Sequence, residues 1–465
     1  MKSMEEILNG SVDGMAAAIR QGDVSSVELT NAFIARIEAV NPTLNALVMP
    51  TFDLARKYAE RADQDLAKGE IQGVLHGVPM TMKDSLDTFD AVTTWGTLGR
   101  KDFRPGIDAT AVARLRAQGA VLMGKTNTPE FTLSFKTDNL VYGSTKNPHD
   151  PERTPGGSSG GAAALIAAGA SPFDLGTDTG GSIRLPSHYS GIAGIKPTSG
   201  RVPCTGNALP ISGLTARISQ VGPMARRVSD LALLLDIISG PDNQDPYCIP
   251  AEQRNYNDVD IEGLRIAWHS DNGICTPESA VVSAVETARD LLTGEGMSLT
   301  EARPSGLEMS QLISSRVFNA DDGLQVENLL ADARTEQPSP LLGSRPKDLP
   351  ESSARDVATV MNVWDNYRSS MLSFFDDFDV LICPVNATTA IPLEAPIDFS
   401  AFSYTMAYNM TGWPGTVIRA GTDANHLPVG IQIIAAPFRE DHSLAVAQWL
   451  ENALGPFAPP AISAW

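Results

Sequence analysis

The chain has 465 residues, 42% of them hydrophobic, which is enough to bury a large core. Its 55 acidic and 35 basic residues give a formal net charge of −20, which argues against an extended surface for nucleic acid or an anionic membrane. The N-terminal residues lack the apolar core of a secretory signal, and the apolar stretch 160–173 is too short and too rich in Gly and Ala to span a bilayer.

These properties favour a cytoplasmic enzyme that binds neither nucleic acid nor a membrane. The four cysteines lie far apart and form no C-x-x-C pair, which argues against a zinc site or a disulfide framework. We therefore expect free thiols and no metal site.

The first 70 residues are predicted to be helical. Apolar residues recur at helical spacing in "VDGMAAAIRQGD" (12–23) and "SSVELTNAFIARIEAVNP" (25–42). Ser25 or Ser26 is a suitable N-cap for the second helix, and Pro42 is expected to end it.

After residue 70 the sequence pattern changes from one typical of helices to one typical of strands. A first strand is expected within 73–88, which is rich in Val, Met and Thr, and further candidates follow at 120–126, 173–179, 263–269, 380–385, 415–421 and 429–436. Helical stretches separate several of them, so we predict an α/β fold with a mostly buried sheet. The strand near 429–435 is expected to return to the sheet begun near the N-terminus.

The chain shows no repeat of solenoid length and no low-complexity tract. Residues 304–353 are richer in polar residues and Pro, so we interpret them as part of an insertion or cover and not as a domain boundary. A single domain is therefore expected.

Lys83 closes the first predicted strand. Alternation along the strand places Val78, Met80 and Met82 on one face and Thr81 and Lys83 on the other. A lysine at a strand end is usually a solvated charge, whereas a lysine in a dry pocket has its pKa lowered and acts as a neutral base.

Two glycine-rich stretches carry serines. "TPGGSSGG" (154–161) matches G-x-S-x-G, but no Lys follows its glycines as a phosphate-binding P-loop requires. An α/β-hydrolase would make Ser158 the nucleophile and would need a downstream acid and histidine. The downstream histidines, none in a distinctive context, are His188, His269, His426 and His442. In "GTDTGGSIR" (176–184), two glycines before Ser182 let backbone N–H groups converge, as an oxyanion hole requires.

Together these stretches resemble the amidase signature family. The motifs that carry the resemblance stand in the family's usual order and are "LHGVPMTMKD", "GKTNTPEF", "GSTKNP", "PGGSSGGAAA", "GTDTGGSIRLP", "GIAGIKPTSGRV" and "GPMARRVSDLALLL". The similarity covers nearly the whole chain and is most specific between Leu75 and Val202.

The resemblance implies a large, mixed, mostly buried central β-sheet covered by α-helices on both faces, in one domain spanning 1–465. Within it we expect an N-terminal helical region at 1–70, the signature core at 71–235 and a variable cover segment at 300–370.

The resemblance also implies a Ser-Ser-Lys triad of Lys83, Ser158 and Ser182. Ser182 would be the nucleophile, and Ser158, after a non-proline cis peptide at Gly157, would relay its proton to neutral Lys83. The backbone N–H groups of the predicted oxyanion hole are those of Thr179, Gly180, Gly181 and Ser182. Supporting roles are expected for Gly157, Ser159, Asp178 and Arg184, and no metal or organic cofactor is required.

The substrate pocket is expected near the triad. Its predicted apolar residues are Phe131, Phe135, Leu140, Tyr142, Leu209 and Ile211, which bring few fixed charges. We therefore predict a hydrolase of neutral linear amides, extending to aryl amides, esters and carbamates.

Two alternatives remain at this point. One is the glutaminase (A) subunit of a tRNA-dependent amidotransferase, which shares the motifs but needs partner subunits. The other is an inactive binding protein on the same scaffold, which the intact triad disfavours. The leading hypothesis is a stand-alone monomer or homodimer whose partner is a small amide-type substrate.

Overall fold

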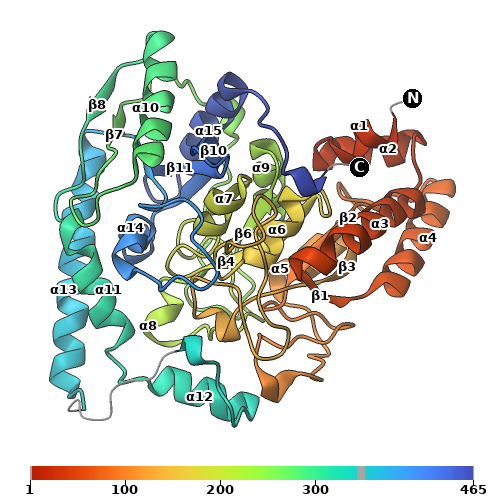
Figure 1. Ribbon diagram of the computed structural model, residues 1–465, viewed down its shortest axis with the longest axis horizontal. Helices are drawn as coiled ribbons and strands as arrows, with labels where there is room; N and C mark the ends of the chain where they lie inside the picture. The colour runs from red at the N-terminus through yellow and green to blue at the C-terminus, as the bar shows by residue number, and fades with distance from the viewer. Residues whose placement is uncertain (1–2, 343–350, 464–465) are drawn as a thin grey trace.

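The computed structural model describes residues 3–342 and 351–463, which form two sheets surrounded by helices (Figure 1). The larger sheet has eight strands in the order β4-β6-β5-β10-β11-β9-β7-β8. Its strands are β4 (Phe173–Asp178), β6 (Gln220–Ala225), β5 (Ala193–Lys196), β10 (Gly415–Thr422), β11 (Pro428–Ala435), β9 (Val380–Pro384), β7 (Ile266–Trp268) and β8 (Leu299–Glu301). β7 pairs in parallel with β8 and β9, and the other pairs are antiparallel, so the sheet is mixed as predicted.

Helices cover both faces of this sheet. β11 alternates: Val429, Ile431 and Ile433 point into the main apolar core with side chains of α10 (Ser279–Gly294) and α15 (Glu440–Leu454). Its other face, represented by Gly430 and Gln432, meets α7 (Arg184–Ser190). A strand that is covered on both sides has a nearly continuous apolar sequence, and this is why the sequence indicated a buried sheet.

The smaller sheet has three strands in the order β1-β3-β2: β1 (Leu47–Pro50), β3 (Val121–Thr126) and β2 (Pro79–Lys83). The expectation that the C-terminal strand rejoins the sheet begun near the N-terminus is therefore wrong, because β11 pairs with β9 and β10 instead of β2. Instead, β2 packs across β4, the edge strand of the larger sheet.

The expected strands are all present, and four more were not predicted. Three of them, β1, β5 and β8, have four residues or fewer, which is too short for a clear strand pattern in the sequence. The fourth, β6, contains Pro223, and a proline argues against a central strand. Pro223 pairs with Leu175 of β4 but lies outside the β6–β5 ladder, which involves only Met224 and Ala225.

The N-terminal helices are α1 (Met4–Leu8), α2 (Val12–Gln21), α3 (Ser26–Leu44) and α4 (Phe52–Ala67). Ser25, one of the two predicted N-cap residues, caps α3, and its side chain and Glu28 form a reciprocal capping box. Pro42 does not end the helix: α3 continues to Leu44 and stops at Asn45, which adopts a left-handed conformation. A proline in the last turn removes only one helical hydrogen bond, so two further residues remain helical.

The remaining helices lie along the rest of the chain. They are α5 (Thr110–Ala117), α6 (Gly160–Ala167), α8 (Gly213–Ala216), α9 (Val228–Ile238), α11 (Ser310–Phe318), α12 (Leu324–Ala333), α13 (Ala354–Leu372) and α14 (Ser403–Thr411). Short 3₁₀ turns include η2 (Glu130–Thr132) and η7 (Phe399–Phe402). Of the predicted cover segment 300–370, residues 343–350 lie outside the described residues.

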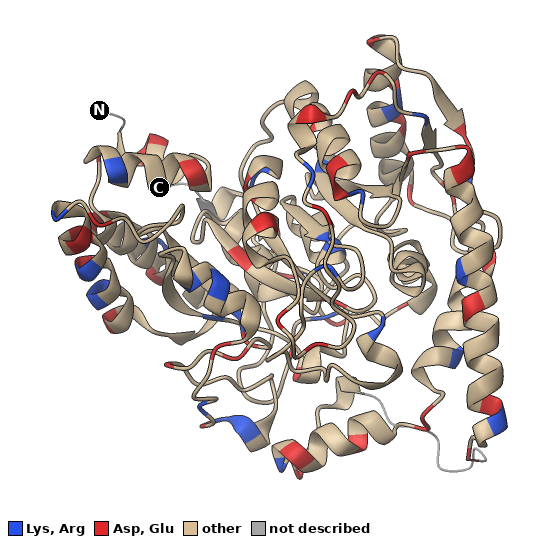
Figure 2. Ribbon diagram, turned by 180° about the vertical axis from the view of Figure 1, so that it is seen from behind, with Lys and Arg blue, Asp and Glu red and all other residues tan. Residues whose placement is uncertain are grey.

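Charged side chains gather on the outer helices. Figure 2 shows acidic and basic residues interspersed along α13 and along the N-terminal helices. Within the described ranges, none of the helices combines the length and apolar character that a bilayer crossing needs.

Candidate active site

Lys83 lies at the end of β2 and is completely buried. Its Nζ is 2.6 Å from Ser158 Oγ, 2.9 Å from Ser159 Oγ and 2.7 Å from Thr177 Oγ1. Thr81, two residues earlier, bonds Asp174 on β4, so both side chains face β4 as the strand alternation predicted. Met80 and Met82 point the other way into the apolar core.

The surroundings of Lys83 favour its neutral form. Burial lowers the pKa of Lys83 well below its ordinary value, although the carboxylates of Asp178 and Asp174 act in the opposite direction. A neutral amine has one lone pair and two N–H groups, so it can accept one hydroxyl proton and donate to two oxygens. Three hydroxyls surround Nζ, which matches that capacity.

Ser158 and Ser159 lie on a turn that leads into α6. The peptide bond between Gly157 and Ser158 is cis. A Cβ at Gly157 would lie 2.7–2.8 Å from backbone atoms of Phe135 and Lys136, so this position has room only for glycine. The N–H of Ser159 donates to the carbonyl of Ser182 at 3.2 Å, which joins this turn to the turn that carries Ser182.

Among the residues that the structure describes, no histidine forms a hydrogen bond with Ser158. His188, buried on α7, accepts the N–H of Gly430 at its Nδ1, and its Nε2 lies 3.0 Å from the carbonyl of Thr388. This geometry does not match the α/β-hydrolase arrangement, in which a histidine activates the serine.

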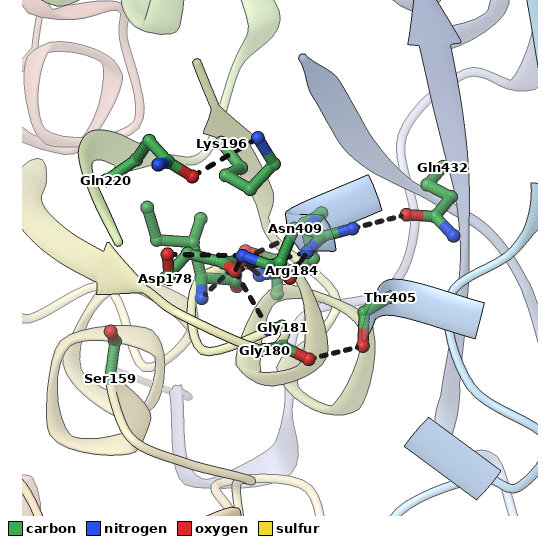
Figure 3. Close-up of polar contacts among 12 residues, drawn as sticks. Ser159, Asp178, Gly180, Gly181, Arg184, Lys196, Gln220, Thr405, Asn409 and Gln432 are labelled. Carbon is green, nitrogen blue, oxygen red and sulfur yellow. Dashed lines mark hydrogen bonds and ion pairs between the residues drawn. The ribbon is translucent and has the colours of Figure 1, made fainter. Parts of the chain in front are cut away.

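The Asp178 carboxylate organises the turn before and after Ser182 (Figure 3). Its Oδ1 accepts the N–H of Gly181 at 2.8 Å, and its Oδ2 accepts the N–H of Ile183 at 3.1 Å. Arg184 adds two charge-assisted hydrogen bonds of 3.1 Å, and both side chains are fully buried. Burial alone would raise the pKa of Asp178, but the charge and hydrogen bonds of Arg184 outweigh it and hold this pKa below its ordinary value.

One of the four predicted oxyanion-hole donors is thus already engaged, since Gly181 donates to Asp178. The N–H groups of the other three, Thr179, Gly180 and Ser182, have no hydrogen-bond acceptor among the residues that the structure describes. These three groups therefore remain available to a bound oxygen atom.

A cavity of about 460 Å³ opens beside this turn. It is lined by Thr132, Leu133, Phe135, Thr179, Gly180, Ser182, Gln311, Ser314, Ser315, Phe318, Asn319, Phe399, Phe402, Ser403 and Met406. No charged side chain is among these lining residues. The cavity is therefore suited to a neutral, largely apolar molecule.

The structure separates the six predicted pocket residues. Phe135 lines the cavity and stacks on Phe402 with ring centroids 3.9 Å apart. The others lie elsewhere: Phe131 and Leu209 are buried together in a small separate cluster, Leu140 is exposed, Ile211 packs against the main core, and Tyr142 is half-buried near Asn45. They are near Ser158 or Ser182 in sequence, but sequence proximity does not determine which side chains line the same cavity.

Sequence reasoning missed most of the cavity wall. Phe318 comes from α11, Phe402 from η7 and Met406 from α14, all more than 130 residues after Ser182. Thr177, which contacts Lys83, was also missed. Its position in "GTDTGGSIR", the motif that carries Ser182, could have identified it as a candidate site residue.

The Amidase family model matches residues 28–444. The chain belongs to the amidase family. This confirms the resemblance drawn from the motifs, and the chain is accordingly a hydrolase that acts on carbon–nitrogen bonds.

Individual amidase relatives match over nearly their whole length. The A subunit of glutamyl-tRNA(Gln) amidotransferase from Chloroflexus aurantiacus is 35% identical, over 95% of this chain and 96% of its own. Indoleacetamide hydrolase of Bradyrhizobium diazoefficiens is 34% identical, over 95% of this chain and 86% of its own. The solved structure of 6-aminohexanoate cyclic dimer hydrolase complexed with substrate has a TM-score of 0.87 and 28% identity, over 98% of this chain and 100% of that one.

Proposed function

We propose that this amidase hydrolyses neutral, largely apolar linear amides, including aryl amides, through a Ser-Ser-Lys triad and an acyl-enzyme. The observation that carries the proposal is the buried Lys83 amine, 2.6 Å from Ser158, beside a cavity that Ser182 lines. Esters and carbamates are further candidate substrates because attack on their carbonyl carbon creates the same oxyanion.

The proton route begins at Lys83. Neutral Lys83 takes the proton of Ser158, Ser158 takes the proton of Ser182, and the Ser182 oxygen attacks the carbonyl carbon. Protonated Lys83 then returns a proton through Ser158 to the departing nitrogen. Water repeats the sequence on the acyl-enzyme, releases the acid and restores Ser182. No metal or organic cofactor takes part in the proposed steps.

The oxyanion is assigned to the N–H groups of the predicted set that remain after Gly181, namely Thr179, Gly180 and Ser182. Gly181 contributes indirectly because its bond to Asp178 holds the turn in place. A single donor of this kind typically lowers the barrier by ~3 kcal/mol.

The lining of the cavity supports a neutral substrate over glutamine. Glutamine carries a carboxylate and an ammonium group, and burying either without a charged partner is costly. The described cavity wall offers hydroxyls, amides, aromatic rings and the apolar side chains of Leu133 and Met406, and no charged group. This disfavours the alternative of an amidotransferase A subunit, although a relative with that name matches the chain. The hydrolase relative named for indoleacetamide fits an apolar aryl substrate better.

Covalent labelling tests the proposal directly. The purified chain, without partner subunits, should hydrolyse a simple anilide and form one adduct with a fluorophosphonate, detected by intact-mass measurement. Ser182→Ala should lose both. Labelling that persists in Ser182→Ala but disappears in Ser158→Ala would make Ser158 the nucleophile, and an inactive, unlabelled wild-type protein would support a binding protein on this scaffold.

A cytoplasmic location and a monomeric or homodimeric state complete the proposal. Both follow from the sequence properties and the stand-alone mechanism.

A further inference from the structure

Helix α14 contacts the turn before Ser182 from a part of the chain more than 200 residues away. Its Ser403 and Met406 line the cavity, and its Thr405 and Asn409 point at Gly180 and Asp178 (Figure 3). One helix therefore joins the cavity wall to the backbone that follows β4.

The peptide unit between Gly180 and Gly181 is held at both ends. Thr405 Oγ1 donates to the carbonyl of Gly180 at 2.7 Å, and the N–H of Gly181 donates to Asp178 Oδ1 at 2.8 Å. A peptide unit is planar, so two opposed hydrogen bonds determine its orientation. Gly181 has a φ of +130°, and a Cβ there would collide with the Thr405 hydroxyl.

Asn409 holds the acceptor of that second hydrogen bond. Its Nδ2 donates to Asp178 Oδ1 at 2.8 Å, and its Oδ1 accepts a short hydrogen bond from Arg184. The amide thus bridges the buried ion pair and keeps Oδ1 of Asp178 directed at Gly181. Asn409 and Thr405 are both essentially buried.

The turn needs such restraint because glycine has little conformational preference of its own. Two successive glycines lose more backbone freedom on ordering than any other pair, so contacts from outside the turn must select one conformation. The selected conformation leaves the N–H groups of Gly180 and Ser182 without an acceptor among the described residues.

We propose that Thr405 and Asn409 are positioning residues for hydrolysis: they hold the Gly180–Gly181 peptide unit so that the neighbouring N–H groups meet the substrate oxygen. The inference rests on the proposed function. Neither side chain reacts; each acts through the backbone, so its loss lowers the stabilisation of the oxyanion and leaves substrate binding in the cavity intact.

A matched set of variants tests the role. Thr405→Val keeps the shape but removes the hydroxyl, whereas Thr405→Ser retains it. Thr411→Val is the control, because Thr411 lies on the same helix and its buried hydroxyl has no hydrogen-bond partner among the described residues. Asn409→Ala is the second test variant, and thermal unfolding checks that each variant folds.

The readouts are kcat and KM for a neutral anilide and inhibition by an alkylboronic acid, which forms a tetrahedral adduct with a serine. Thr405→Val and Asn409→Ala should each lower kcat roughly tenfold or more, leave KM within about twofold and weaken boronate inhibition by a similar factor. Thr405→Ser and Thr411→Val should stay close to wild type.

The outcomes separate the positioning role from the proposed function. Wild-type kcat in both Thr405→Val and Asn409→Ala, or a loss confined to KM, would overturn the positioning role. Ser182→Ala with wild-type turnover in the same assay would overturn the proposed function itself. An inactive Ser182→Ala beside fully active Thr405→Val and Asn409→Ala rejects the positioning role alone.

Discussion

Lys83 is one of three completely buried lysines among the residues that the structure describes, together with Lys125 and Lys196. Burial lowers the pKa of all three, to about 8 for Lys125 and about 7 for Lys196. Their partners distinguish them. Lys125 and Lys196 donate their shortest hydrogen bonds to backbone carbonyls, which have no proton to give. Lys83 has three hydroxyl oxygens within 2.6–2.9 Å of its Nζ, whereas the two hydroxyls near Lys125 lie 3.4 Å away. Only a hydroxyl partner can pass a proton to a neutral amine.

The pH dependence of hydrolysis should report this state of Lys83. Because burial lowers its pKa, the neutral base is present above that lowered value, so kcat/KM should rise with pH and level off well below pH 10.5. Lys83→Met should lower kcat by roughly 10²- to 10⁴-fold, the usual contribution of a general base. Steady-state kinetics from acid to alkaline pH measure both effects.

The control for this prediction is Lys101→Met, which makes the same chemical change at an exposed lysine and should retain the wild-type profile. Circular dichroism establishes that Lys83→Met is folded. Near-normal turnover of a folded Lys83→Met at neutral pH would contradict the assignment of Lys83 as the base.

Helix α11 shows how one element sets the chemistry of the cavity. Gln311, Ser314, Ser315 and Phe318 recur at helical spacing, so one face of α11 lies along the cavity. The helix also carries Arg316, which is not among the lining residues. A rotation of the helix by one residue would expose the cavity to that charge.

Ser315→Arg tests this view because Ser315 is exposed enough to accept a longer side chain. A guanidinium beside the cavity should raise kcat/KM for a carboxylate-bearing anilide by about tenfold, through a charge-assisted hydrogen bond. Ser315→Asp should lower it. For the matched neutral anilide, both variants should stay within about threefold of wild type. Equal effects on both substrates would show that α11 does not select for charge.

The net charge of −20 acts on the whole molecule at longer range than any single residue. The electric field of this charge repels anionic substrates before they reach the cavity. Added salt weakens the field, which at 0.1 M ionic strength decays over a distance of roughly 10 Å. Raising the ionic strength from ~10 mM to ~300 mM should therefore increase kcat/KM for a carboxylate-bearing anilide about two- to fivefold. The neutral anilide, measured in parallel, should change little. A parallel rise for both substrates would point to a general salt effect instead of electrostatic repulsion.

The sequence by itself determined the local features of this protein. The Ser25–Glu28 capping box and the two faces of the strand that ends at Lys83 are set by neighbours within a few residues. The glycine-rich turns around Ser158 and Ser182 are equally local, since their shape depends on the absence of a Cβ. These motifs were sufficient to indicate the amidase family and the residues of the proposed triad.

Only the tertiary structure decided the shape of the cavity, the separate small sheet and the state of Lys83. Phe402 and Phe318 reach the cavity from distant segments, whereas Phe131 and Leu209, much nearer the motifs, pack elsewhere. Asn409 meets Asp178 across 231 positions of sequence. The physical reason is that burial, and the pKa shift that burial causes, depend on every element packed around a side chain, and short-range sequence patterns do not contain that information.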